Sequence, residues 1–152
     1  MMSMSAIGDR EAQALLEAAA DARTRAYIPY SGFAVGAALL DAEGRIHPGC
    51  NIENAAYGPT NCAERTSLFA AIAAGCPPRS FRAIAVTADT AEPVTPCGTC
   101  RQVLAELCAP DMPVVLGTIR GGWRVTTVAE LLPGAFTRTQ LDEDRSRKGG
   151  AG

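Results

Sequence analysis

The chain is poor in the residues that mark several protein classes. It has one histidine among 152 residues, 5% aromatic residues and a formal net charge of −2. Its 14 basic residues, all but Lys148 being arginine, are scattered along the sequence. Nucleic acid is therefore not an expected partner, because binding it depends on clustered positive charge. No apolar run approaches the roughly eighteen residues of a membrane span, so no membrane partner is expected either.

The amino-terminal residues also lack the pattern of a secretion signal, in which a cationic segment leads into an apolar one. We therefore expect a cytoplasmic protein whose six cysteines are reduced thiols rather than three disulfides. A chain of this length with 47% hydrophobic residues fits one globular domain. We assign this domain to residues 1–136 and expect the charged, glycine-ended tail over 137–152 to be disordered.

The order of the predicted elements indicates an α/β fold. Apolar residues at helical spacing predict helices over residues 9–22, 61–75 and 97–108. Alternating or continuous apolar runs predict strands over 33–40, 45–51, 83–89 and 113–119. Asp9 is the expected cap of the first helix, and Thr60 or Asn61 of the second. A helix, two strands and then alternating helices and strands predict a three-layer α/β/α sandwich with a mixed central sheet.

The stretch PCGTC at residues 96–100 suggests a metal site. Pro96 precedes a predicted helix, where a missing N–H is tolerated, so Cys97 and Cys100 fall in the first helical turn. Side chains at positions i and i+3 share a helix face, about 5–6 Å apart at Cβ. Two thiolates at this spacing can bind one zinc ion.

Cys62, at the start of the preceding predicted helix, can supply a third thiolate. It meets the other two if parallel neighbouring strands bring both helix starts to the same end of the sheet. Helix starts favour thiolates through their free N–H groups and positive dipole. Three protein ligands leave one tetrahedral position for water, which is typical of catalytic zinc. Glu64, two residues after Cys62, is the expected group that moves this water's protons, so no histidine is needed.

Three thiolates on one Zn²⁺ ion give a net charge of about −1, which makes bound water less acidic than at a neutral-ligand site. Arg65 and Arg101 are candidates for offsetting this charge because each is adjacent to a proposed ligand. We expect Arg65 to donate a hydrogen bond to a ligating sulfur. The remaining cysteines, for which buried thiols are the default, are Cys50, Cys76 and Cys108. His47 precedes a proline and is expected to pack rather than to bind metal.

The two motifs together, with Cys97 placed 35 residues after Cys62, match the arrangement of zinc deaminases with cysteine in place of histidine. From residue 27 to 136 the chain resembles the cytidine deaminases, of the small homotetrameric type with three cysteine ligands. The stretches that carry the resemblance are YIPYSGFAVGAAL, GCNIENAAYG, NCAERTSLFAAI, PCGTCRQVLAEL and ELLPGAF. It implies hydrolytic deamination of cytidine and deoxycytidine to uridine and deoxyuridine, a pyrimidine salvage reaction, with one zinc ion per chain.

The stretch NIEN suggests a sugar site. Asn51 and Glu53 lie two residues apart on extended chain and point the same way, so they can offer an amide and a carboxylate to sugar hydroxyls. By resemblance, both hold the ribose 3′-hydroxyl while Phe33 packs against the nucleoside.

The resemblance implies further contacts, and Glu64 has a role in each proton transfer. The backbone near Ala55 meets the base, and Tyr57 and Phe136 help to close pockets across subunit boundaries. Glu64 takes a proton from the attacking water and delivers protons to N3 and to the departing amino group.

Three other interpretations remain open from the sequence. A deaminase of another aminopyrimidine nucleoside, such as blasticidin S, would share the zinc motifs. A closed structural zinc site would need a fourth thiol, from Cys50 or Cys108. A redox protein would pair Cys97 with Cys100.

Overall fold

A five-stranded mixed sheet forms the centre of the structure, a computed structural model that describes residues 7–150. The strands are β1 (Val35–Leu40), β2 (Ile46–Cys50), β3 (Ala83–Ala88), β4 (Pro113–Thr118) and β5 (Trp123–Thr127). Their order across the sheet is β2-β1-β3-β4-β5, with β3 and β4 parallel and the other neighbouring pairs antiparallel.

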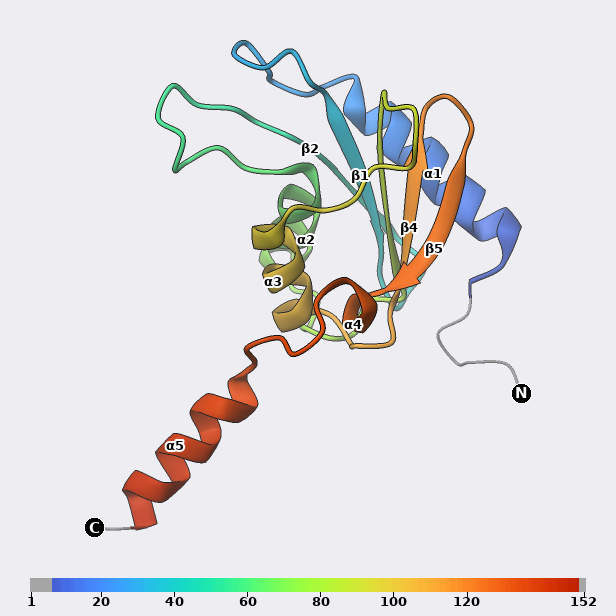
Figure 1. Cartoon of the computed structure of the whole chain (residues 1–152). Helices are drawn as coiled ribbons and strands as arrows, with labels where there is room; N and C mark the ends of the chain where they lie inside the picture. The colour runs from blue at the N-terminus through green and yellow to red at the C-terminus, as the bar shows by residue number, and fades with distance from the viewer. Residues whose placement is uncertain (1–6, 151–152) are drawn as a thin grey trace.

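Helices cover both faces of this sheet, so the predicted α/β/α sandwich is confirmed (Figure 1). The helix on one face is α1 (Asp9–Arg23), and those on the other are α2 (Ala63–Ala73), α3 (Gly98–Leu107) and the short α4 (Val128–Leu131). Every residue of β3 and β4 is buried, which explains why these strands are continuous apolar runs in the sequence. None of the described helices combines the length and apolar character needed to cross a bilayer.

Two glycines allow the helices to lie close to the sheet. A Cβ at Gly36 on β1 would collide with the carbonyl oxygen of Ala19 in α1. A Cβ at Gly49 on β2 would collide with the carbonyl oxygen of Ala63 and lie 2.6 Å from the amide nitrogen of Ser67, both in α2. These neighbours are backbone atoms, so no side-chain rotation can relieve the clash.

We expect Gly49→Ala to lower the free energy of unfolding by about 1–3 kcal/mol, the usual range for overpacking. Urea unfolding of the purified variant measures this loss. Gly58→Ala is the matched control because no atom lies within 4 Å of a Cβ built there. Equal unfolding midpoints for the two variants would contradict the role given to Gly49.

The helix starts differ from the sequence prediction. Gly8 occupies the cap position of α1, and Asp9 is the first residue of the helix. The negative charge of Asp9 still interacts favourably with the positive end of the helix dipole. Cys62 caps α2 in place of Thr60 or Asn61. Asn61 is held outside the helix because its backbone exchanges two 2.9 Å hydrogen bonds with Ile52.

In the carboxy-terminal segment the structure has helix α5 (Arg138–Gly150), and the expected disorder of this tail stays a prediction. It extends away from the sheet and the other helices (Figure 1). Thr137 donates from its backbone N–H and hydroxyl to Gln140, and Arg138 pairs with Asp142. A polar helix that extends away from the core is marginal in water, and the boundary after residue 136 stays a prediction. Residues 1–6 and 151–152 of the two predicted segments lie outside the described residues.

Candidate active site

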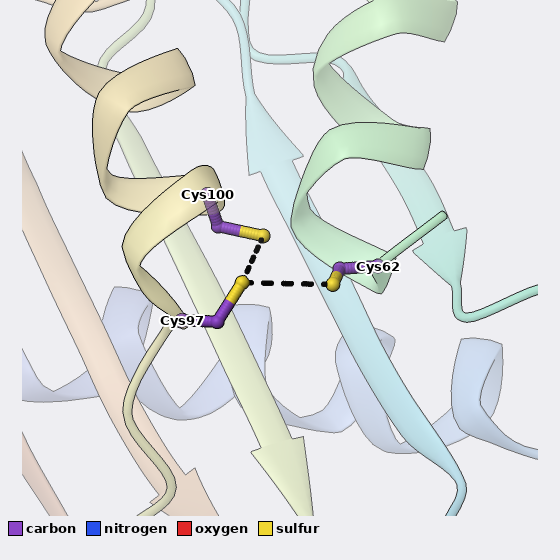
Figure 2. Close-up of side chains that lie close together, drawn as sticks. All are labelled: Cys62, Cys97 and Cys100. Carbon is purple, nitrogen blue, oxygen red and sulfur yellow. Dashed lines mark hydrogen bonds between the residues drawn. The ribbon is translucent and has the colours of Figure 1, made fainter. Parts of the chain in front are cut away.

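Three cysteines meet where α2 and α3 begin (Figure 2). Cys62 caps α2, Cys97 caps α3, and Cys100 is the third residue of α3. The Sγ atom of Cys97 lies 3.8 Å from that of Cys62 and 3.5 Å from that of Cys100. All three sulfur atoms lie within 4.8 Å of one another. We call this set the three-cysteine group.

The route by which the chain brings these helix starts together differs in one respect from the prediction. β2 leads to α2 and β3 leads to α3, and the two strands run in the same direction, as expected. They are not neighbours, however, because β1 lies between them and is antiparallel to both. Both helices therefore begin at the same end of the sheet without a parallel pair between their strands.

The three-cysteine group fits a zinc ion. A tetrahedral ion with Zn–S bonds of about 2.3 Å places its sulfur ligands about 3.8 Å apart, close to the two distances found here. Neither Cys50 nor Cys108 belongs to this group among the described residues. This argues against a closed site with four cysteine ligands, because neither of these two cysteines is placed to be the fourth ligand.

The charges in the group favour a thiolate on Cys62. A hydrogen bond with Cys100 and then the nearby Arg65 lower the pKa of Cys62 to about 5, although burial opposes the shift. Arg65 donates from Nη2 to Cys62 Sγ at 3.2 Å, which is the contact expected from the sequence. The pKa of Cys100 is raised, first by its hydrogen bond with Cys62 and then by burial. Arg65 Nε is buried without a hydrogen-bond partner among the described atoms.

Arg101 takes a different role from the one expected. It donates from Nε to the carbonyl oxygen of Pro96 at 2.8 Å and from Nη1 to that of Leu131 at 2.9 Å. Its guanidinium is thus committed to backbone oxygens and joins the start of α3 to the end of α4. No sulfur contact of Arg101 is seen in the described chain.

Glu64 lies in the first turn of α2 and is only 4% exposed. Burial raises its pKa to about 7, and the neighbouring Cys62 charge adds to this shift. A buried carboxyl with a pKa near neutrality can both accept and donate a proton, as a general acid–base group must. The sequence placed Glu64 two residues after Cys62, and the structure puts both side chains on one cavity.

This cavity has a volume of about 270 Å³. Six residues singled out from the sequence line it, namely Phe33, Asn51, Glu53, Cys62, Glu64 and Cys97. The structure therefore brings the predicted sugar-binding side chains, the predicted proton carrier and two of the sulfur atoms to one hollow. Cys100 lies behind this wall and is fully buried.

Asn51 and Glu53 have structural contacts of their own. Asn51 accepts a hydrogen bond from Val35 N and donates one to Phe33 O, so its amide holds the strand that follows Phe33. Glu53 Oε1 accepts hydrogen bonds from the backbone N–H groups of Tyr30 and Ser31. An amide and a carboxylate each have further hydrogen-bonding positions, so these contacts leave capacity for a ligand.

Three of the predicted substrate-binding residues do not line the cavity: Ala55, Tyr57 and Phe136. Tyr57 is 91% exposed and Phe136 is 57% exposed. The carbonyl oxygen of Phe136 accepts a hydrogen bond from Gln102 in α3, which holds this residue beside the site helices. The predicted contacts of Tyr57 and Phe136 across subunit boundaries stay a prediction.

The sequence analysis missed part of the cavity wall. The missed residues are Ser31, Val35, Ala63, Val86, Val94 and Thr95. Thr95 comes directly before the PCGTC stretch, and this position next to Pro96 was the sequence signal that could have assigned Thr95 to the site. Val86 belongs to a continuous apolar strand, so no pattern distinguishes it from an ordinary core residue.

Comparisons with known proteins agree with this geometry. Residues 9–116 match the family model described as the cytidine and deoxycytidylate deaminase zinc-binding region. A cytidine deaminase of Sporosarcina psychrophila is 55% identical over 131 residues, covering 86% of this chain and 95% of the relative. One of Halalkalibacterium halodurans is 56% identical over 131 residues, covering 86% and 98%. The crystal structure of the Burkholderia pseudomallei cytidine deaminase superposes with a TM-score of 0.80 at 56% identity, covering 82% of this chain and 98% of that one.

Proposed function

The chain belongs to the cytidine and deoxycytidylate deaminase family, and from this membership we propose that it hydrolyses cytidine and deoxycytidine to uridine and deoxyuridine with release of ammonia. The observation that carries the proposal is the cavity that joins buried Glu64 and the three-cysteine group to Asn51 and Glu53. One end of this cavity offers proton transfer beside a metal site. The other offers polar groups suited to a sugar.

We propose that Cys62, Cys97 and Cys100 hold one Zn²⁺ ion per chain. When bound, zinc supplies Lewis-acid chemistry that makes water a stronger nucleophile at neutral pH. The three thiolates would leave the site with a net charge of about −1. The Arg65 guanidinium, 3.2 Å from Cys62 Sγ, offsets this charge.

Glu64 carries the protons of the reaction. It accepts a proton from the attacking water as the water oxygen bonds to C4 of the pyrimidine, and it passes this proton to N3. The second proton of the water then moves through Glu64 to the amino group, which leaves as ammonia while C4 keeps the oxygen. Burial suits Glu64 to both directions of transfer because its pKa, about 7, lies near neutrality.

The nucleoside is held by side chains at the other end of the cavity. Asn51 and Glu53 bind the ribose 3′-hydroxyl, and Phe33 packs against the nucleoside. The backbone near Ala55 meets the base.

We also propose a homotetramer in which Tyr57 and Phe136 close the cavities of neighbouring subunits. Their exposure in the single chain supports this assembly, because such side chains gain from burial between subunits. Light scattering of the purified protein tests the assembly. The cytoplasmic location and the role in pyrimidine salvage remain predictions from the sequence.

Arg65→Gln is expected to weaken zinc binding by about tenfold to a hundredfold, since removing groups that support metal ligands has effects of this size. Competition with a coloured chelator measures the zinc affinity. Arg120→Gln is the matched control because this arginine pairs with Asp89 away from the cavity. Unchanged zinc affinity and activity in Arg65→Gln would remove the supporting role of this residue.

The function itself is tested by following the ultraviolet absorbance of cytidine, deoxycytidine and blasticidin S with the zinc-loaded protein. We expect loss of the cytidine and deoxycytidine spectra and none of the blasticidin S spectrum. Turnover of blasticidin S alone would replace our proposal with the related deaminase. No turnover of any of the three, at one zinc per three-cysteine group, would overturn the proposed reaction.

A further inference from the structure

A second set of metal-binding side chains lies at the opposite end of α2. Asp41 follows β1, His47 lies on β2, and Cys76 comes shortly after the end of α2. His47 Nε2 is 2.9 Å from Asp41 Oδ2. Cys76 Sγ is 3.8 Å from Asp41 Oδ2 and 3.7 Å from His47 Nε2. We call this set the Asp–His–Cys group.

We propose that the Asp–His–Cys group is a second metal site, which takes Zn²⁺ or a similar thiol-binding divalent transition-metal ion. The ligand atoms are Asp41 Oδ2, His47 Nε2 and Cys76 Sγ, whose mutual distances lie within 4.8 Å. Mixed oxygen, nitrogen and sulfur ligands suit zinc and exclude Mg²⁺ and Ca²⁺, which prefer oxygen alone. The site is independent of the proposed deaminase reaction.

The geometry requires little movement. Tetrahedral zinc with bonds of about 2.3 Å to sulfur and about 2.0–2.2 Å to nitrogen and oxygen places these ligands about 3.3–3.6 Å apart. The two sulfur distances, 3.7 and 3.8 Å, lie just above this range, and the nitrogen–oxygen distance of 2.9 Å lies further below it. Small rotations of His47 and Cys76 therefore suffice. His47 would bind through Nε2 as the tautomer with its proton on Nδ1.

Asp41 is already held in position for a cation. Its other oxygen, Oδ1, accepts hydrogen bonds of 2.9 Å from the backbone N–H groups of Glu43 and Arg45, which form the turn between β1 and β2. Its side chain is 3% exposed. The turn therefore fixes this carboxylate with Oδ2 close to His47 Nε2 and Cys76 Sγ.

The formal charges balance. The Asp41 carboxylate and a Cys76 thiolate together neutralise one divalent ion, with His47 neutral. Arg45 is the cation that competes for this site, because its Nε donates to Asp41 Oδ2 at 3.1 Å. Its side chain is 65% exposed and also pairs with Glu43 at 2.9 Å, so the guanidinium can keep Glu43 and release Oδ2.

The Asp–His–Cys group is separate from the three-cysteine group. The helix α2 has 11 residues, about 16 Å at 1.5 Å per residue, and the two groups lie at its opposite ends. A metal in the second site would join the β1–β2 turn to the end of α2. Variants there should therefore alter metal content without altering deaminase activity.

Equilibrium dialysis of the full chain against Zn²⁺, followed by elemental analysis, tests the site. We expect two ions per chain in the wild type and one in both Cys76→Ser and His47→Gln, with activity unchanged in both. Cys108→Ala is the matched control. Cys108 belongs to neither group, so this variant should keep two ions. One ion per chain in the wild type, or two in both variants, would overturn the proposal and leave an ion-pair network at this turn.

A second measurement needs no variant and separates this proposal from the proposed function. Alkylation by iodoacetamide, mapped by mass spectrometry, reports on each cysteine of the wild-type protein. Zinc should slow alkylation of Cys76 at least about tenfold, and a chelator should restore it. Equal rates at Cys76 with and without zinc would overturn the second site, whatever happens at Cys97.

Discussion

Glu64→Gln is expected to lower kcat for cytidine by at least about 10²–10⁴-fold, the usual contribution of a positioned proton carrier. Glutamine keeps the shape of the side chain but cannot accept a proton from water or deliver one to N3. Glu64 is not among the proposed metal ligands, so the zinc content of the variant should match that of the wild type. Initial rates by ultraviolet absorbance and elemental analysis of the same sample measure both quantities.

Glu106→Gln is the control for this experiment. Glu106 lies on α3 outside the cavity, and its carboxylate forms a long, 4.0 Å pair with Arg79. It should keep wild-type turnover. Near-normal turnover by Glu64→Gln would show that another group carries the protons, and a loss of zinc in that variant would show that Glu64 supports the metal site.

Cys97→Ser and Cys62→Ser should each lose the zinc ion of the three-cysteine group, and activity should fall to the uncatalysed background. Both cysteines occupy the cap position of a helix with an extended backbone, where serine is among the preferred residues. The substitution therefore removes a thiolate ligand while favouring the same helix start. Loss of metal in these variants can be assigned to the ligand itself rather than to an unfolded helix.

Elemental analysis should find one ion fewer per chain than in the wild type, with a circular dichroism spectrum that is unchanged. Cys108→Ala serves as the control, since this buried thiol packs in the core under α3 and is a member of neither metal group. Full zinc content and full activity in both serine variants would contradict the ligand assignment.

Local patterns were enough to predict much of the molecule. Helices α1 to α3 and strands β1 to β4 followed from apolar spacing, and the pair Cys97 and Cys100 followed from i, i+3 geometry on one helix. The start of α2 was misplaced by one or two residues because a β-type pairing of Asn61 with Ile52 decides where the helix begins. That pairing depends on residues nine positions apart and leaves no mark in the helical pattern.

Features that depend on the packing of distant segments could not be predicted. The position of β1 between β2 and β3 depends on which strands pair with each other. The apolar runs in the sequence do not indicate the order of the strands in the sheet. The wall residues Val86 and Val94 look like core residues until the cavity is seen. Asp41, His47 and Cys76 have no shared motif, and only the meeting of the β1–β2 turn with the end of α2 brings them together.

The placement of Cys62 and Glu64 two residues apart at one helix start affects how the site responds to substitutions elsewhere in the chain. Their separation is set by the geometry of a single helical turn. A substitution in the core can tilt or shift α2 relative to α3, but it moves the thiolate and the carboxylate together as one rigid unit. Substitutions elsewhere in the chain are therefore expected to change zinc affinity first, because they move Cys97 and Cys100 relative to Cys62. The alignment of Cys62 with Glu64 should change only after that.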